Sequence, residues 1–197
     1  KNTILLSAGI VVPTLPLLFP TNKAIEGKSI GKAVQKADIT QQDILMNSVS
    51  ISKSIPLIVS GYNLFENSYT YASFNIDKWK ELLLQMSQMA DYVIVDCSSD
   101  FSNNKPTSAA MALADSVIQI YAAEYRSEIF FASQQKVLKD ENYDDERFIK
   151  AIMVGHNSRN QAFNEIINAK NIKNKIPFSE QVGHQYQSGT LFSGTSD

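Results

Sequence analysis

Short apolar runs alternate with helical patterns along most of this chain, and this alternation limits the folds that it can adopt. The runs at 56–60, 92–95, 117–120 and 151–154 have the continuous apolar character of strands that are buried on both faces. The intervening segments are long enough to hold helices. The pattern predicts an α/β fold, with a doubly wound, mostly parallel sheet that carries helices on both faces.

The other elements follow from local signals. Apolar residues recur every three or four positions at 76–90, which predicts an amphipathic helix. Thr40 and Asp43 have the spacing of a helix N-cap, and a Pro-rich loop is expected from Pro13 to Pro20. Further strands are expected at 3–8 and 173–178, and further helices at 29–37, 107–114, 126–139, 160–170 and 179–188.

Composition narrows the class of protein. With 197 residues, 44% hydrophobic and 19% charged, the chain is long enough for a single domain spanning 1–197. A formal charge of −2 with scattered Lys and Arg gives no sequence evidence for nucleic-acid binding. The apolar start is too short and too interrupted by proline for a transmembrane segment of about 20 residues. The lone cysteine, Cys97, fits a reducing compartment, and we expect it to be a small buried side chain.

Polar residues follow several of the expected strands. Asp96 ends the run "YVIVD", Ser7 ends the first strand, and Asn157 follows the run at 151–154. Parallel strands place their carboxyl ends at one edge of the sheet, where ligands bind. We therefore expect Ser7, Asp96 and Asn157 to gather at one edge.

Several of these motifs together carry a resemblance to a known family. In order, they are "ILLSAGIVVPTLPLLF", "DYVIVDCSS", "ALADSVIQIYAAEYRSE", "IMVGHNSRN" and "NKIPFSEQVGHQYQSGTLF". Their order and spacing resemble the MinD and ParA group of deviant-Walker P-loop ATPases. The resemblance covers nearly the whole chain and implies a P-loop NTPase-like fold with ATP and Mg²⁺ as cofactors.

The resemblance also implies roles for individual residues. Asp96 matches the Walker B position, which contacts Mg²⁺ through water when the site is complete. Asn157 matches the residue that reads the nucleotide base. The nucleotide-binding residues implied in this way are Asn157, Arg159, Pro177 and Phe178.

Two departures from the family pattern bear on activity. No glycine-rich loop with lysines occurs in these 197 residues, so the chain lacks the Walker A strand-loop-helix whose backbone cradles the phosphates. Ser7 and Gly9 stand where the family has Asp-x-Asp, whose second Asp positions the attacking water. The site is therefore expected to be degenerate, with little or no ATP hydrolysis.

The missing first strand has a structural consequence. In the resembled fold it lies in the middle of the sheet, so its loss would expose unpaired strand edges and an apolar face. The simplest account is that the chain is N-terminally incomplete. The alternative is a sheet that has closed over the gap.

The resemblance implies a nucleotide-dependent partitioning or spatial-positioning protein with protein partners. It also implies a homodimer in the cytoplasm, with peripheral membrane attachment as a further option. Two alternatives stay open. One is an active ATPase whose phosphate-binding loop lies upstream, and the other is an α/β interaction domain that binds no nucleotide. The residues upstream of Lys1 would separate them.

Overall fold

The computed structural model describes residues 1–9, 11–20, 23–51, 56–122, 124–140, 145–154 and 172–192. The chain divides into two compact units. The first contains Lys1–Leu113 and Gln181–Asp197, and the second contains Ala114–Glu180. The expectation of a single domain over the whole chain stays a prediction.

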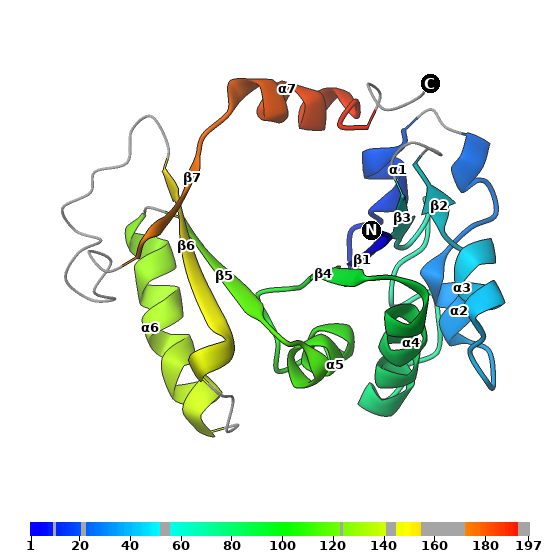
Figure 1. Ribbon diagram of the computed structural model, residues 1–197, viewed down its shortest axis with the longest axis horizontal. Coiled ribbons are helices and arrows are strands. Elements are labelled where there is room, and N and C mark those ends of the chain that lie inside the picture. Colours follow the sequence, from blue (N-terminus) through cyan, green and yellow to red (C-terminus); the bar gives the residue numbers. More distant parts are fainter. Residues whose placement is uncertain are drawn as a thin grey trace. The chain divides into compact units, whose positions relative to one another are not determined.

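The strands form one sheet in each unit (Figure 1). They are β1 (Thr3–Ser7), β2 (Val49–Ser50), β3 (Leu57–Ser60) and β4 (Tyr92–Asp96) in the first unit, and β5 (Val117–Ala122), β6 (Phe148–Val154) and β7 (Asn174–Pro177) in the second. Their orders are β2-β3-β1-β4 and β5-β6-β7. Every described pair is parallel except β2 with β3. The predicted mostly parallel α/β fold is confirmed.

The helices agree with most of the expected positions. They are α1 (Leu15–Leu18), α2 (Ile30–Val34), α3 (Gln41–Met46), α4 (Ile76–Met89), α5 (Lys105–Leu113), α6 (Tyr125–Asp140) and α7 (Glu180–Ser188), with 3₁₀ turns at Lys23–Ile25 and Asp145–Arg147. The prediction of a continuous loop from Pro13 to Pro20 was wrong, because α1 forms there. Pro16 sits in the first turn of α1, where a missing N–H costs nothing. The helix expected at 160–170 lies outside the described residues.

Both faces of β1 are covered. Ile4 and Leu6 of β1 point into a core that includes residues of α2, α4 and α5. Leu5, which lies between Ile4 and Leu6 in the sequence, points to the opposite face and belongs to a second core with residues of α1. The Phe192 ring stacks on Phe19 at 5.6 Å and helps to close that second core. The doubly wound arrangement is therefore present in this unit.

β4 is the last strand of the first sheet, and only one of its edges is paired among the described residues. Val93 and Val95 pack against the core that contains α4, whereas Tyr92 and Ile94 are exposed on the other face.

The second unit packs α6 against one face of its sheet. The Tyr121 ring of β5 lies 3.9 Å from the Phe131 ring of α6, centroid to centroid. The adjacent residues Ile118 and Ile120 point to the other face, and both are exposed. Met153 of β6 is exposed as well. This sheet thus presents an apolar face to solvent.

The capping box at the start of α3 gives a testable stability prediction. The Thr40 hydroxyl accepts from the Asp43 N–H at 3.1 Å, and the Asp43 carboxylate accepts from the Thr40 N–H at 3.1 Å. Thr40→Ala should lower the free energy of unfolding by about 1 kcal/mol, because the Asp43 N–H loses its acceptor, whereas Thr40→Ser should keep this stability. Chemical denaturation measures both variants, and equal losses would contradict the cap.

The same cap predicts a pH dependence. The hydrogen bond from the Thr40 hydroxyl lowers the pKa of the Asp43 carboxyl below its ordinary 3.8. A carboxyl whose pKa is lowered by folding stabilises the fold above its unfolded pKa, and this contribution is lost as the pH falls through the folded value. The stability difference between wild type and Asp43→Asn should therefore shrink as the pH falls below about 3.8. A difference that stays constant in acid would contradict this.

Candidate functional site

The pairing of β1 with β4 builds the candidate site at the carboxyl ends of the two strands. Ser7 and Asp96 are register partners at the last position of the ladder. The backbone continues this pairing beyond the strands, because the Ala8 N–H donates to the Asp96 carbonyl at 2.9 Å. Ser7 is buried and Asp96 is exposed. The expected meeting of these two residues at one edge is confirmed, while Asn157 and Arg159 lie outside the described residues.

The turn after β1 is held from two sides. The Thr14 hydroxyl donates to Ser7 Oγ at 2.7 Å, which ties the end of β1 to the segment before α1. The Asn104 side-chain amide donates to the Ala8 carbonyl at 3.0 Å, although these residues lie far apart in the sequence. Asn104 is fully buried, so this bond is shielded from water. The two contacts fix the backbone that leads to Gly9.

Asn104 also caps α5 and connects it to the turn after β4. Its side-chain oxygen accepts from the Thr107 N–H at 3.0 Å, as an N-cap does. The Thr107 hydroxyl in turn accepts from the Ser98 N–H at 3.0 Å. Sequence reasoning missed both residues. The available signal was "NKPT", an Asn followed by a proline in the first helical turn.

Cys97 follows Asp96 and is exposed, so the expectation of a buried side chain was wrong. The residue lies beyond the end of β4, where the strand no longer places it in the core. The residue as a whole is exposed, but its thiol is partly desolvated by the atoms around it, and this desolvation raises the pKa of the thiol. The Thr107 hydroxyl opposes the rise, and the nearby Asp96 carboxylate adds to it. The thiol is therefore protonated at neutral pH and is a weak nucleophile.

Position 9 has room for a side chain. A Cβ atom added to Gly9 would lie 3.7 Å from the Val12 carbonyl oxygen and 3.8 Å from Ser7 Oγ, which are ordinary van der Waals contacts. Close packing does not exclude a larger residue there. The glycine thus leaves the end of β1 without a carboxylate beside Asp96.

Pro177 and Phe178 lie at the carboxyl end of β7. Pro177 is the register partner of Val154, the last residue of β6, and the Phe178 side chain is 53% exposed. These positions agree with the edge at which parallel strands bind ligands. Their role in nucleotide binding stays a prediction.

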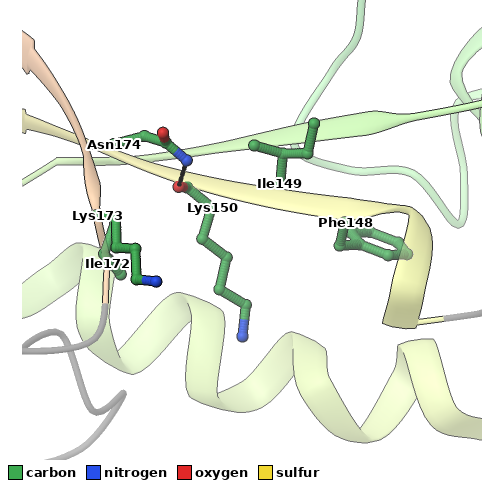
Figure 2. Close-up of a pocket in the computed structure, with 6 residues that line it drawn as sticks. All are labelled: Phe148, Ile149, Lys150, Ile172, Lys173 and Asn174. Carbon is green, nitrogen blue, oxygen red and sulfur yellow. Dashed lines mark hydrogen bonds between the residues drawn. The ribbon is translucent and has the colours of Figure 1, made fainter.

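The described surface has hollows, and two of them bear on where a ligand could bind. One, of about 350 Å³, lies at the start of β6 and just before β7, and its lining includes Phe148, Lys150 and Lys173 (Figure 2). Asn174 donates to the Lys150 carbonyl there at 3.1 Å. This hollow is at the amino ends of its strands, opposite to the expected ligand edge.

The second hollow, of about 340 Å³, lies in the first unit and is lined mainly by aromatic and small residues, including Tyr62, Tyr71 and Trp79. Burial, with a smaller contribution from Tyr71, raises the pKa of Tyr62 to about 12. The phenol is therefore neutral at physiological pH, and the wall that it forms carries no charge.

Metal sites and membrane spans were searched in the described part of the chain only. There, no three His, Cys, Asp or Glu side chains come close enough to hold a metal ion by themselves. No described helix has the length and apolar character needed to cross a bilayer.

No protein-family model matches the sequence, and no curated protein matches it. Solved structures do match. A ParA family ATPase from Chlorobium tepidum TLS has a TM-score of 0.79 at 14% identity, covering 99% of this chain and 80% of that chain. MinD from Aquifex aeolicus, in its complex with MinC, has a TM-score of 0.66 at 15% identity, with coverages of 96% and 74%.

An ATP complex of McdA from Cyanothece has a TM-score of 0.64 at 12% identity, with coverages of 99% and 79%. At these identities the likeness concerns the fold. It extends over nearly all of this chain in each comparison. The chain therefore has the fold of the ParA and MinD ATPases.

Proposed function

We propose that this chain is part of a nucleotide-dependent partitioning or spatial-positioning protein of the ParA and MinD type, with little or no ATP hydrolysis. One observation carries the proposal. The fold of this chain matches that of a ParA family ATPase over 99% of the chain. Within this fold, Ser7 and Asp96 are register partners at the ends of two paired parallel strands. That edge is where ligands bind in such sheets.

Asp96 suits a magnesium contact through water. It is exposed, and its backbone is fixed by the bond from Ala8. Mg²⁺ usually keeps several of its waters and binds proteins through one or two carboxylates plus substrate phosphates. When bound, the ion would neutralise phosphate charge, and the role of Asp96 would be to orient one of its waters.

The same edge lacks two groups that hydrolysis needs. These 197 residues contain no match to G-x-x-x-x-G-K-[S/T], the spacing of a loop that cradles phosphates. Gly9 stands where the resembled ATPases carry the Asp that orients the attacking water. Catalysis of phosphoryl transfer consists almost entirely of positioning the reactants and stabilising charge. The absence of either group should therefore lower the rate of ATP hydrolysis.

The proposal assigns nucleotide-base contacts to Asn157, Arg159, Pro177 and Phe178. Its support in the described residues is the position of Pro177 and Phe178 at a carboxyl edge. Protein partners and a homodimer belong to the same proposal, as does a cytoplasmic location with peripheral membrane attachment. The MinC:MinD complex is the solved example of a partner bound to a protein of this fold.

Paired binding and turnover assays test the proposal. Calorimetric titration with Mg-ATP and a phosphate-release assay should be run on this chain and on the full-length protein that contains it. Losing one well-placed catalytic contact costs about 100- to 1,000-fold in rate, so this chain should release no measurable phosphate. The full-length protein should bind Mg-ATP with little turnover, and rapid turnover there would favour the active ATPase. Absence of binding by either protein would favour the interaction domain.

Removal of the carboxylate tests the role of Asp96. Asp96→Ala should weaken Mg-ATP binding by the full-length protein by roughly 10- to 100-fold, the usual effect of losing an outer-shell ligand. The control is Asp115→Ala, which removes an exposed carboxylate just before the amino end of β5. With EDTA in place of Mg²⁺, Asp96→Ala should have no further effect. Equal losses in both variants would contradict the assignment.

Placing an acid at position 9 tests whether the absence of a water-orienting Asp there limits ATP hydrolysis. Gly9→Asp should change the free energy of unfolding by less than about 0.5 kcal/mol, since the position has room. In the full-length protein it should raise phosphate release by roughly 100-fold or more, whereas the isosteric, uncharged Gly9→Asn should not. Equal turnover by the two variants would show that position 9 does not orient the water.

A further inference from the structure

The loop between β3 and α4 holds a bulky side chain in an unfavourable backbone conformation. Phe65 has a φ of 64°, and among the described residues it is the only one other than glycine with a positive φ. A left-handed backbone is uncommon for a bulky residue, so the surrounding contacts have to maintain it. The Phe65 side chain is also 92% exposed, although burial of its ring would be favourable. The loop thus presents an aromatic ring at some cost in stability.

Hydrogen bonds on both sides of Phe65 fix the shape of this loop. The Asn63 side chain accepts from the Leu64 N–H at 2.7 Å and donates to the Lys28 carbonyl at 2.8 Å. The Glu66 N–H closes the turn by donating to the Asn63 carbonyl at 3.0 Å. A loop that is already ordered loses less conformational entropy when it binds. The fixed shape therefore suits a binding contact.

The aromatic hollow of about 340 Å³ lies beside this loop, and all of its lining residues belong to the first unit. Tyr62 and Tyr71, from the same loop, stack with 6.0 Å between ring centroids and form part of its wall. Trp79 of α4 contributes a further aromatic ring. An apolar cavity of about 150 Å³ is large enough to bind benzene, so this hollow has room for a phenyl ring.

The exposed ring and the hollow are close together in the sequence and complement each other. Because Phe65 stands only a few residues from Tyr62 and Tyr71, each copy of the protein carries both halves of a contact, as a twofold symmetric pair requires. The charges agree as well. Glu66 directly follows Phe65, whereas the exposed Lys105 lines the hollow.

We propose that two copies of this protein pair through this loop, with the Phe65 ring of each copy inserted into the hollow of the other. Aromatic side chains bury about 150–250 Å² each, so Phe65 and the exposed Tyr69 of two copies bury about 600–1,000 Å². Stable interfaces bury about 1,200 Å² or more, which makes this a weak dimer that forms at high protein concentration. The pairing needs no nucleotide, so it and the proposed nucleotide binding can fail separately.

Sedimentation equilibrium of the full-length protein, without nucleotide and from about 10 μM to about 1 mM, tests the pairing over the range of weak complexes. Phe65→Asn should weaken association by at least about 10-fold, the effect of losing a central aromatic anchor. Asn tolerates a left-handed backbone, so this variant should keep the fold. The control is Met46→Ala on α3, which removes an apolar side chain of 65% exposure and should leave association unchanged. A wild type that stays monomeric throughout, or equal association by Phe65→Asn, would overturn the proposal.

The hollow is tested by filling it. Ala72 lines the hollow and is exposed, so Ala72→Phe should block the entry of a ring and weaken association although Phe65 is intact. A mixture of Ala72→Phe with Phe65→Asn should associate more strongly than either variant alone, because one intact ring then meets one open hollow. Association of Ala72→Phe equal to that of wild type would overturn the proposal, as would a mixture no stronger than its components.

Photo-cross-linking identifies what the ring contacts. Benzoylphenylalanine at position 65 of the full-length protein should form adducts at Tyr71 or Trp79 on irradiation. Equal amounts of unlabelled and ¹⁵N-labelled protein separate the two sources, because an adduct between copies joins a light peptide to a heavy one. Adducts of this mixed kind at the hollow are the expected result. Adducts confined to single chains, such as contacts with the second unit, would overturn the proposal.

Discussion

The parallel ladder between β1 and β4 is the interaction on which the rest of the first unit depends. β1 is flanked by β3 and β4, and its side chains alternate between two cores. A shift of one residue in this register would move Ile4 and Leu6 out of their core and would also separate Ser7 from Asp96. The hydrophobic pattern that specifies the fold therefore specifies the geometry of the candidate site too.

Asn104 extends this coupling from the sheet to the loops. One side chain caps α5 and holds the turn after β1, and Thr107 of the same helix holds the turn after β4. Because Asn104 is fully buried, its hydrogen bonds have no competition from water. These bonds hold the turns at this edge, and Gly9 stands where the resembled ATPases carry an Asp. Rigid placement combined with a reduced set of reactive groups is the physical basis for proposing binding with little hydrolysis.

The sequence predicted the elements whose signals are local and strong. The spacing of apolar residues predicted α4, the apolar run predicted β4, and Thr40 with Asp43 predicted the start of α3. Prediction from the sequence failed where contacts between residues distant in the chain determine the local structure. α1 forms in a Pro-rich stretch because Leu15 packs into a core, β2 is too short to show a pattern, and Asn104 acts on a residue distant in the sequence. The meeting of Ser7 with Asp96 was predictable because parallel strands share an edge, whereas the exposure of Cys97 was not, since it depends on where β4 ends.

The central claim is that Mg-nucleotide binds at the carboxyl end of the β1–β4 pair. The most direct measurement is an NMR titration of the full-length protein with Mg²⁺ and a non-hydrolysable ATP analogue, followed at backbone amides. We predict saturable shifts at Ala8, Gly9 and Cys97, with none at Phe148 or Lys150. The latter two line the hollow at the amino ends of β6 and β7, where lysines offer a competing place for phosphate. Saturable shifts at Phe148 and Lys150 with none at Ala8, Gly9 and Cys97 would contradict the account.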